Sequence, residues 1–299
     1  MSRRLCLWTI LLSALVLAPL HGCDQDSGDD DDNDTGGDDT GDECGNPDDA
    51  NPGEPAPHGE DWEPSPGTAW QWQLTGAIDS SYDVTMYDID LVEAPAATID
   101  ALHAAGRVVI CYFSAGSWEE WRDDAGEFPA AALGNPLEGW PDERWLDINN
   151  QEVRRIMGER LDLAVEKECD GVEPDNVDGF ANDNGLGLTA EAQLAYNRWL
   201  ADEAHQRGLS VGLKNDLCQL ENLRDWFDWA LNEECVAYDE CGLYDDWLAA
   251  GKAVFHVEYV DDWAAAPAKA AAVCGVRPAM DTLIKTWDLG PERLACSDQ

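Results

Sequence analysis

Residues 151–175 read QEVRRIMGERLDLAVEKECDGVEPD, and this stretch decides the fold class. From Gln151 to Glu168, apolar residues recur at helical spacing, which predicts a helix with one apolar face made of Val153, Ile156, Met157, Leu161 and Ala164. The run from Gly171 to Asp175 follows after a short break and predicts a strand. A helix that packs its apolar face on a neighbouring strand is the repeating unit of parallel α/β folds.

The same alternation of strand and helix extends in both directions along the chain. Seven further strands are predicted, at residues 70–74, 84–89, 108–113, 145–148, 210–213, 229–231 and 253–258. Further helices are predicted at residues 96–105, 189–207 and 219–227. Eight strands joined by helices predict a TIM-like (β/α)8 barrel over residues 61–299. A doubly wound sheet is the alternative, but no Gly-x-Gly-x-x-Gly motif follows the first strand.

The first 22 residues have the pattern of an export signal. Two arginines precede an apolar run from Leu5 to Leu20, which is too short to span a bilayer and is followed by acidic residues. The sequence Leu20-His21-Gly22-Cys23 resembles a bacterial lipobox, in which the cysteine is lipidated and becomes the new N-terminus. We therefore expect residues 1–22 to be a lipoprotein signal peptide and Cys23 to be lipidated. An ordinary secretory signal is the alternative, and both interpretations predict export.

Acidic residues dominate the segment after the signal. Residues 24–49 contain thirteen of them among small polar residues, a composition that cannot bury enough apolar surface to fold. We expect residues 23–60 to be a disordered acidic tether between a membrane anchor and the barrel. The whole chain has 62 acidic and 18 basic residues, so nucleic acid is not an expected partner. We also expect the protein to be a monomer.

The cysteine count fits an oxidising compartment. Eight cysteines remain once Cys6 and Cys23 are assigned to the signal and the anchor, and disulfides are plausible in an exported chain. Cys235 and Cys241 are close enough in sequence to close a small loop, and Cys274 with Cys296 could hold the C-terminal segment. Cys111 lies within an apolar strand, where a free buried thiol is the alternative to a disulfide.

Carboxylates gather where the predicted strands end. Asp88 and Asp90, Glu173 and Asp175, Asp216 after Lys214, Glu233 and Glu234, and Glu258 all stand at such positions. Function gathers at the carboxyl ends of the strands in parallel α/β folds, so several acids should meet at one mouth of the barrel. Cleavage of a glycosidic bond needs two carboxyl groups, one to protonate the leaving oxygen and one to act as a nucleophile or to activate water.

Other chemistries have less support in the sequence. No Gly-x-Ser-x-Gly motif or zinc-binding spacing is present, and no cofactor or metal is expected. The 14 tryptophans fit a carbohydrate partner, because aromatic faces stack on sugar rings, although core packing explains most of them equally well. Trp72 and Tyr112 are the aromatic residues that we select as site candidates.

These motifs together resemble glycoside hydrolase family 114, the endo-α-1,4-polygalactosaminidase group. The resemblance extends from about Trp70 to Tyr259. It is carried, in the family's order, by residues 109–119 (VICYFSAGSWE), 139–147 (GWPDERWLD), 169–179 (CDGVEPDNVDG), 212–216 (GLKND), 232–235 (NEEC) and 255–259 (FHVEY).

The resemblance implies a TIM-like barrel and a catalytic pair that matches Asp175 and Glu233, with Asp175 as nucleophile and Glu233 as acid/base in a retaining mechanism. Glu234 is the alternative to Glu233. We expect six residues to contact the substrate or to support the pair: Trp72, Asp88, Tyr112, Glu173, Lys214 and Glu258. The implied substrate is an α-1,4-linked galactosamine polymer, which is cationic when deacetylated and suits an acidic protein. The alternatives are a tethered polysaccharide-binding lipoprotein with an inactive barrel and an enzyme for another glycan.

Overall fold

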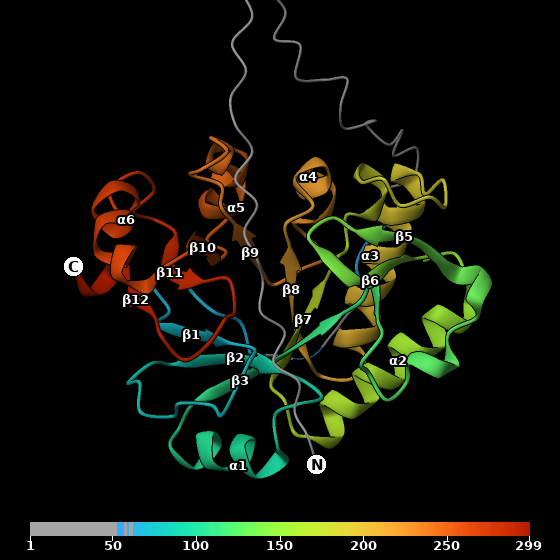
Figure 1. Cartoon of the computed structure of the whole chain (residues 1–299), viewed down its shortest axis with the longest axis horizontal. Coiled ribbons are helices and arrows are strands. Elements are labelled where there is room, and N and C mark those ends of the chain that lie inside the picture. Colours follow the sequence, from blue (N-terminus) through green and yellow to red (C-terminus); the bar gives the residue numbers. More distant parts are fainter. Residues whose placement is uncertain (1–52, 57–58, 60–61) are drawn as a thin grey trace, which may run out of the picture. The chain divides into compact units, whose positions relative to one another are not determined.

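The main sheet of the computed structural model consists of parallel strands that curl around a common axis, with helices on the outside (Figure 1). The structure describes residues 53–56, 59 and 62–299. The predicted signal peptide, Cys23 and most of the predicted tether therefore lie outside the described residues. No helix in the described part of the chain is long and apolar enough to cross a membrane.

Eight parallel strands and one antiparallel strand form the main sheet of the described residues, in the order β1-β2-β3-β7-β8-β9-β10-β11-β12. The strands are β1 (Trp70–Gln73), β2 (Met86–Asp90), β3 (Val108–Ser114), β7 (Gly171–Asp175), β8 (Ser210–Lys214), β9 (Trp229–Glu233), β10 (Val254–Val260), β11 (Asp281–Thr286) and the antiparallel β12 (Leu294–Ala295). The predicted barrel class is therefore confirmed, although two of its strands differ from the prediction.

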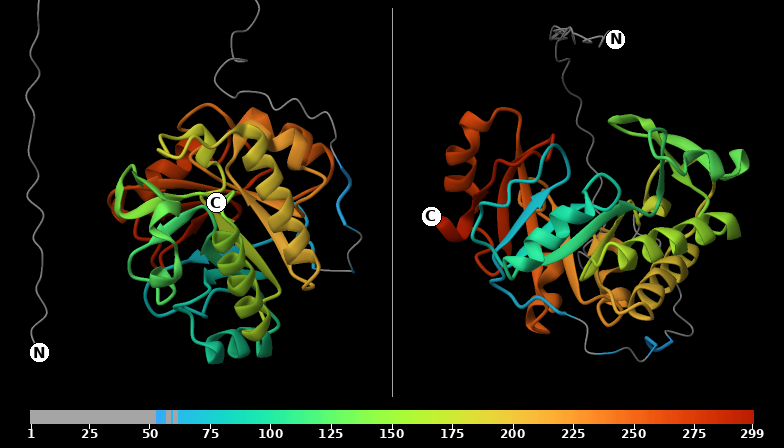
Figure 2. Two further views of the ribbon diagram at one scale, coloured as in Figure 1. Left: turned by 90° about the vertical axis from the view of Figure 1, so that its right-hand side faces the viewer. Right: turned by 90° about the horizontal axis from the view of Figure 1, so that it is seen from below.

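The predicted strand at residues 145–148 is wrong as a barrel strand. Residues 140–146 form β6 (Trp140–Leu146), the centre of a separate antiparallel sheet with β4 (Ser117–Glu119) and β5 (Leu133–Leu137). In the barrel, β3 pairs directly with β7. The eighth parallel strand is instead β11, which the prediction omitted because the buried Lys285 interrupts its short apolar run. Figure 2 shows the green β4-β5-β6 sheet beside the barrel strands.

The two edges of the parallel sheet approach each other without forming a strand ladder. Trp70 Nε1 donates a hydrogen bond of 2.8 Å to the carbonyl oxygen of Asp281, and the Leu74 amide donates one of 3.0 Å to the carbonyl oxygen of Leu289. The segment after β11 thus lies along β1. We call this junction between β1 and the segment 281–289 the seam.

The helices cover the outer face of the sheet, as their apolar stripes require. They are α1 (Ala96–Ala104), α2 (Gln151–Glu166), α3 (Ala190–His205), α4 (Leu220–Leu223), α5 (Asp245–Ala249) and α6 (Ala266–Val273). The side chains of Asn150 and Thr189 accept backbone hydrogen bonds at the starts of α2 and α3, so both helices begin at capping residues. All five residues of the predicted α2 stripe are buried.

Two apolar layers hold the strands in place. The inner layer fills the barrel with large side chains, including Trp70, Trp72, Trp229 and Phe255, while the outer layer lies between strands and helices. Gly212 makes room for this packing, because a Cβ atom there would lie 2.3 Å from the Trp229 ring. The barrel is therefore solid below its mouth, and substrate access is limited to the carboxyl ends of the strands.

Three disulfides join described residues. Cys235–Cys241 and Cys274–Cys296 form as expected from their spacing. The third, Cys111–Cys169, links β3 to the turn that precedes β7, so Cys111 is not a free thiol. Cys218 is disulfide-bonded as well.

Candidate active site

A cleft of about 1160 Å³ lies at the carboxyl ends of the strands. Its floor contains the last residues of β7, β8 and β9, namely Asp175, Lys214 and Glu233. Tyr112 and Tyr259 extend the floor onto β3 and β10. These five side chains come from five neighbouring strands, so the curl of the sheet brings together residues that are far apart in the sequence.

Lys214 connects the acids of the floor. Its Nζ lies 3.1 Å from Asp175 Oδ1, 3.2 Å from Glu233 Oε2 and 3.1 Å from Glu173 Oε1. Burial alone would lower the pKa of Lys214, but these three carboxylates raise the pKa well above its usual value. Lys214 is thus a fixed ammonium whose charge is shared among three acids.

Two tyrosines hold the outer oxygens of the same acids. The Tyr112 hydroxyl donates a hydrogen bond of 2.9 Å to Asp175 Oδ2, and the Tyr259 hydroxyl donates one to Glu233 Oε1. Burial, followed by the charge of the neighbouring acid, raises the pKa of each tyrosine well above its usual value, so both hydroxyls stay protonated as donors. The Tyr259 ring also stacks on Trp287, with centroids 4.0 Å apart.

The residues that follow the three central strands share a backbone conformation. Asn176, Asn215 and Glu234 have φ values of 60°, 48° and 61°, in the left-handed region that non-glycine residues rarely adopt. Each turn redirects the chain as soon as its strand ends. Asn215 Oδ1 then accepts the Glu233 amide at 3.0 Å, and Asn215 Nδ2 donates to Glu233 Oε2 at 3.2 Å. Such conformations concentrate at functional sites.

This turn separates Glu233 from its neighbour. Glu233 contacts Lys214, Asn215 and Tyr259, whereas the charges that most affect the pKa of Glu234 are those of Glu258 and Lys269. Glu234 still lines the cleft. Within the doublet, Glu233 is the carboxylate that shares its ammonium with Asp175.

A second layer of acid lies beneath the floor. Glu173 is fully buried, accepts a hydrogen bond of 3.0 Å from Trp72 Nε1 and pairs with Lys214. Burial raises the pKa of Glu173 to about 7 against the opposing effect of Lys214. Asp88 is also fully buried, and neither of its oxygens receives a hydrogen bond from a donor among the described residues. Burial and the neighbouring Glu173 raise the pKa of Asp88 well above its usual value.

Glu258 supports the loop after β9 from the outer face of the sheet. Its Oε1 accepts the amides of Val236 and Ala237 at 2.9 and 3.1 Å, and its Oε2 lies 2.7 Å from Lys269 Nζ. Although burial opposes it, hydrogen bonds from His256 and Lys269 lower the pKa of Glu258 to about 2. Glu258 is a permanent anion that holds the backbone of the loop carrying Glu234 and Tyr238.

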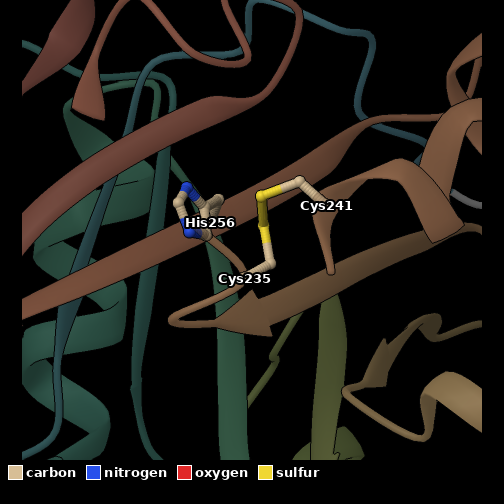
Figure 3. Close-up of side chains that lie close together, drawn as sticks. All are labelled: Cys235, Cys241 and His256. Carbon is tan, nitrogen blue, oxygen red and sulfur yellow. A yellow bond between two sulfur atoms is a disulfide. The ribbon is translucent and has the colours of Figure 1, made fainter. Parts of the chain in front are cut away.

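The same loop is closed by the Cys235–Cys241 disulfide, beside His256 (Figure 3). The two sulfurs and a His256 ring nitrogen lie within 4.8 Å of one another, the spacing of a metal site. Both sulfurs are used by the disulfide, and His256 contacts Thr282 and Glu258. In this oxidised form the cluster is a structural brace and not a set of thiolate ligands.

The sequence and fold place this chain among known hydrolases. The profile described as glycoside-hydrolase family GH114 matches residues 53–299. The chain belongs to this family. Its structure is similar to that of Ega3 from Aspergillus fumigatus in complex with galactosamine, with 42% sequence identity, a TM-score of 0.77, and coverage of 82% of this chain and 100% of Ega3.

A second similar structure is the glycoside hydrolase domain of PelA from Pseudomonas aeruginosa. It has 15% sequence identity and a TM-score of 0.56, with coverage of 76% of this chain and 97% of that domain, so it supports the fold alone. No curated protein sequence matches the chain. As a member of GH114 with this fold, the protein is a glycoside hydrolase.

Within the GH114 fold, the predicted site residues fall into two groups. Trp72, Tyr112, Asp175, Lys214 and Glu233 line the cleft. Asp88, Glu173 and Glu258 are fully buried and do not line it. The geometry gives these three acids protein partners or neighbours below and behind the floor, so it offers them no direct contact with a substrate.

Several cleft residues were absent from the sequence prediction. Asn215 and Tyr259 contact Glu233 directly, and Glu143 lines a wall supplied by the small β4-β5-β6 sheet. Asn215 and Tyr259 lie inside the quoted 212–216 and 255–259 motifs, next to the acids Asp216 and Glu258. Glu143 could not be found from strand ends, because its strand does not belong to the barrel.

Proposed function

We propose that this protein is an endo-acting, retaining hydrolase of α-1,4-linked galactosamine polymer, with Asp175 as nucleophile and Glu233 as acid/base. The observation that carries the proposal is that these two acids face one ammonium in the cleft of a GH114 barrel. The 42% identity to a protein whose crystal structure is a complex with galactosamine supports the choice of sugar.

The separation of the two acids supports retention. Because Asp175 Oδ1 and Glu233 Oε2 contact the same Lys214 Nζ at 3.1 and 3.2 Å, these oxygens can be no more than about 6.3 Å apart. Retaining glycosidases have carboxyl groups about 5–5.5 Å apart, whereas inverting enzymes need about 6.5–9.5 Å to admit a water molecule. A limit of about 6.3 Å between the two nearest oxygens is compatible with the retaining spacing and with direct attack by a carboxylate.

The surroundings of each acid favour this division of roles. Asp175 is held by donors on both oxygens, Lys214 Nζ and the Tyr112 hydroxyl, and its side chain is 17% exposed. The Glu233 side chain is more exposed, at 28%. Its role requires this exposure, because it must protonate a leaving group and then deprotonate a water molecule. Asp175 would attack the anomeric carbon while Glu233 protonates the departing oxygen. Glu233 would then take a proton from the water that releases the sugar.

The charge of the cleft favours a cationic substrate. Eleven carboxylate side chains line it, against two basic side chains, Arg122 and Lys214, among the described residues. Both bases are already paired with acids. An excess of this size attracts a polymer of ammonium-bearing sugars and repels uronic acid polymers.

Exposed aromatic residues favour binding of several sugar rings at once. Trp121 follows β4 and Trp140 is the first residue of β6, while Tyr238 and Trp287 follow β9 and β11. All four are about half exposed or more, in contrast to the buried core aromatics. Rings stacked on both sides of the catalytic pair suit cleavage within a chain.

The decisive assay measures new reducing ends and product stereochemistry. Purified protein should release oligosaccharides from deacetylated α-1,4-galactosamine polymer, and NMR should detect the α-anomer first. Binding without release would favour the inactive polysaccharide-binding alternative. Release from neutral or uronic polymers only would assign another substrate. Early appearance of the β-anomer would overturn retention.

We also propose that the enzyme is exported and anchored through lipidated Cys23. The support is the N-terminal pattern of basic, apolar and small residues. Expression in bacteria with a radiolabelled fatty acid should label the protein, and Cys23→Ala should abolish the label. Equal labelling of both forms would overturn the anchor.

A further inference from the structure

Glu143 occupies an unusual position on the wall of the cleft. It lies on β6, two residues before Trp145, and both side chains line the cleft from the small antiparallel sheet. Glu143 is 9% exposed, so more than nine-tenths of its surface is covered by protein. A buried carboxyl group that still reaches a cleft is costly unless something compensates its charge.

A chain of hydrogen bonds fixes Glu143 on the Asp175 side of the cleft. Ser117 Oγ donates to Glu143 Oε2 at 2.6 Å, and Ser114 Oγ lies 2.6 Å from Ser117 Oγ. The side-chain Nδ2 of Asn176 donates to Ser114 Oγ at 2.9 Å, and the backbone N–H of Asn176 donates to Asp175 Oδ1 at 2.8 Å. Gly116 permits this approach, because a Cβ there would lie 1.7 Å from the Asn176 carbonyl oxygen.

No basic side chain among the described residues lies within ion-pair distance of Glu143, although its neighbours are paired. Glu119, opposite it on β4, pairs with Arg122 at 2.8 Å and Arg160 at 3.5 Å. Asp90 pairs with Arg122 at 2.7 Å. The protein thus pairs Glu119 and Asp90 with arginines, whereas Glu143 has no basic partner among the described residues.

Among the charged groups in the described part of the chain that act on Glu143, only Arg122 favours the ionised form of its carboxyl group. Burial raises the pKa of Glu143 to about 7, the Ser117 hydrogen bond opposes this rise, and the charges of Glu119 and Asp175 add to it. Arg122 acts weakly in the opposite direction, and Tyr112 is the remaining titratable neighbour on this side. A cation that arrives in the cleft would therefore stabilise the ionised form of Glu143.

We propose that Glu143 binds the ammonium group of an amino sugar held in the cleft beside Asp175, and so selects free amino sugars over their N-acetylated forms. This inference rests on the proposed function and adds the residue that recognises the amine. Oε2 is used by Ser117, which leaves Oε1 for the ligand. An acetamido group carries no charge and would leave the buried carboxyl uncompensated, with a penalty that the free amine avoids.

The test compares Glu143→Gln with the wild type on deacetylated and N-acetylated α-1,4-galactosamine polymer. Loss of a charge-assisted contact should raise KM for the deacetylated polymer about ten- to hundredfold and change kcat by less than about threefold. Selectivity for the deacetylated polymer should fall by the same factor. Glu138→Gln is the matched control, because it removes one unit of charge from an exposed position on the same cleft wall. It should have a much smaller effect on KM.

Calorimetry supplies a readout that does not depend on turnover. Asp175→Asn protein titrated with deacetylated polymer near pH 7 should release protons, seen as a dependence of the heat on the ionisation enthalpy of the buffer. Adding Glu143→Gln should remove most of this release and flatten the rise in Kd between pH 7.5 and pH 6. Unchanged melting temperatures would establish that both proteins are folded.

The outcomes separate this inference from the proposed function. If the wild type acts on deacetylated polymer and the KM of Glu143→Gln lies within about twofold of the wild-type KM, the assignment of Glu143 is overturned and the proposed function is kept. An equal loss on both polymers, or a loss confined to kcat, would also overturn it. If the wild type neither binds nor cuts galactosamine polymer, both proposals fall together.

Discussion

Asp175 and Glu233 face the same ammonium group, since Lys214 Nζ lies 3.1 Å from one carboxylate and 3.2 Å from the other. This shared contact leads to the first prediction. Asp175→Ala and Glu233→Ala should each lower kcat at least about a thousandfold, because one removes the nucleophile and the other the proton donor. Reducing-end assays under saturating substrate would measure the loss.

Glu234→Ala is the matched control for the doublet. It makes the same chemical change one residue away, where the side chain has no contact with Lys214. It should keep kcat within about fivefold of the wild type. If Glu234→Ala abolished activity while Glu233→Ala kept it, the assignment would move by one residue.

The two tyrosines of the floor should act separately on the two acids. Tyr112→Phe removes a donor to Asp175, and Tyr259→Phe removes a donor to Glu233. A hydrogen bond to a charged group is worth about 1.5–3 kcal/mol, so each variant should lose about ten- to hundredfold in kcat/KM. With an activated aryl glycoside, which needs little help from an acid, Tyr259→Phe should recover more activity than Tyr112→Phe. Equal recovery would contradict the assigned roles.

Replacement of Lys214 should disturb both folding and catalysis. Lys214→Met leaves Glu173, Asp175 and Glu233 without their common counterion, and breaking a buried ion pair costs about 3–5 kcal/mol. Because Lys214 opposes the rise that burial causes in the pKa of Glu173, its loss should raise the pKa of Glu173 further and move the acidic limb of the pH–rate profile to higher pH. Chemical denaturation and the pH dependence of kcat/KM measure the two effects. A variant with wild-type stability and an unmoved acidic limb would rule out this role.

Asp88 should behave as a neutral acid. Its folded-state pKa is raised well above the unfolded value near 3.8, so its contribution to stability is complete below about pH 4 and is lost as the pH rises toward the folded pKa. Asp88→Asn, which cannot ionise, should keep most activity and become more stable relative to the wild type as the pH increases from 4 to 8. Asp88→Ala should instead lose stability at every pH, because it leaves a cavity.

Melting temperatures of the three proteins across this pH range would test the prediction. A constant difference between Asp88→Asn and the wild type would mean that Asp88 does not change its ionisation on folding. A severe loss of activity in Asp88→Asn with an intact fold would indicate that the carboxyl group itself is required.

The barrel could be predicted from the sequence because short apolar runs alternate with amphipathic helices along most of the folded chain. This pattern failed at residues 145–148, where Trp145 and Leu146 are as buried as barrel residues but belong to the antiparallel β6. An apolar run indicates that a segment is buried, but it does not determine which strand pairs with it. β11 was missed for the opposite reason, since Lys285 is fully buried inside a strand with few apolar residues.

Strand ends also located the floor of the cleft, but not the depth of each acid within it. Glu173 and Asp175 are two residues apart on β7 and point to the same side, yet Glu173 is covered and Asp175 reaches the cleft. That difference depends on Trp72 from β1 and Lys214 from β8, which cover Glu173 from other strands. The hydroxyl and amide partners of Glu233 depend on the same long-range packing.

The seam gives the barrel a preferred line of opening. Along the other strand pairs, separation would break a ladder of backbone bonds, whereas β1 is joined to the segment 281–289 by isolated contacts such as Trp70 Nε1 to the Asp281 carbonyl. Amide hydrogens of β1 should accordingly exchange with solvent sooner than those of β7 and β8. Trp287 and Leu289 lie at both the seam and the cleft. Transient opening of the seam would therefore change the width of the cleft where a polymer passes Glu233.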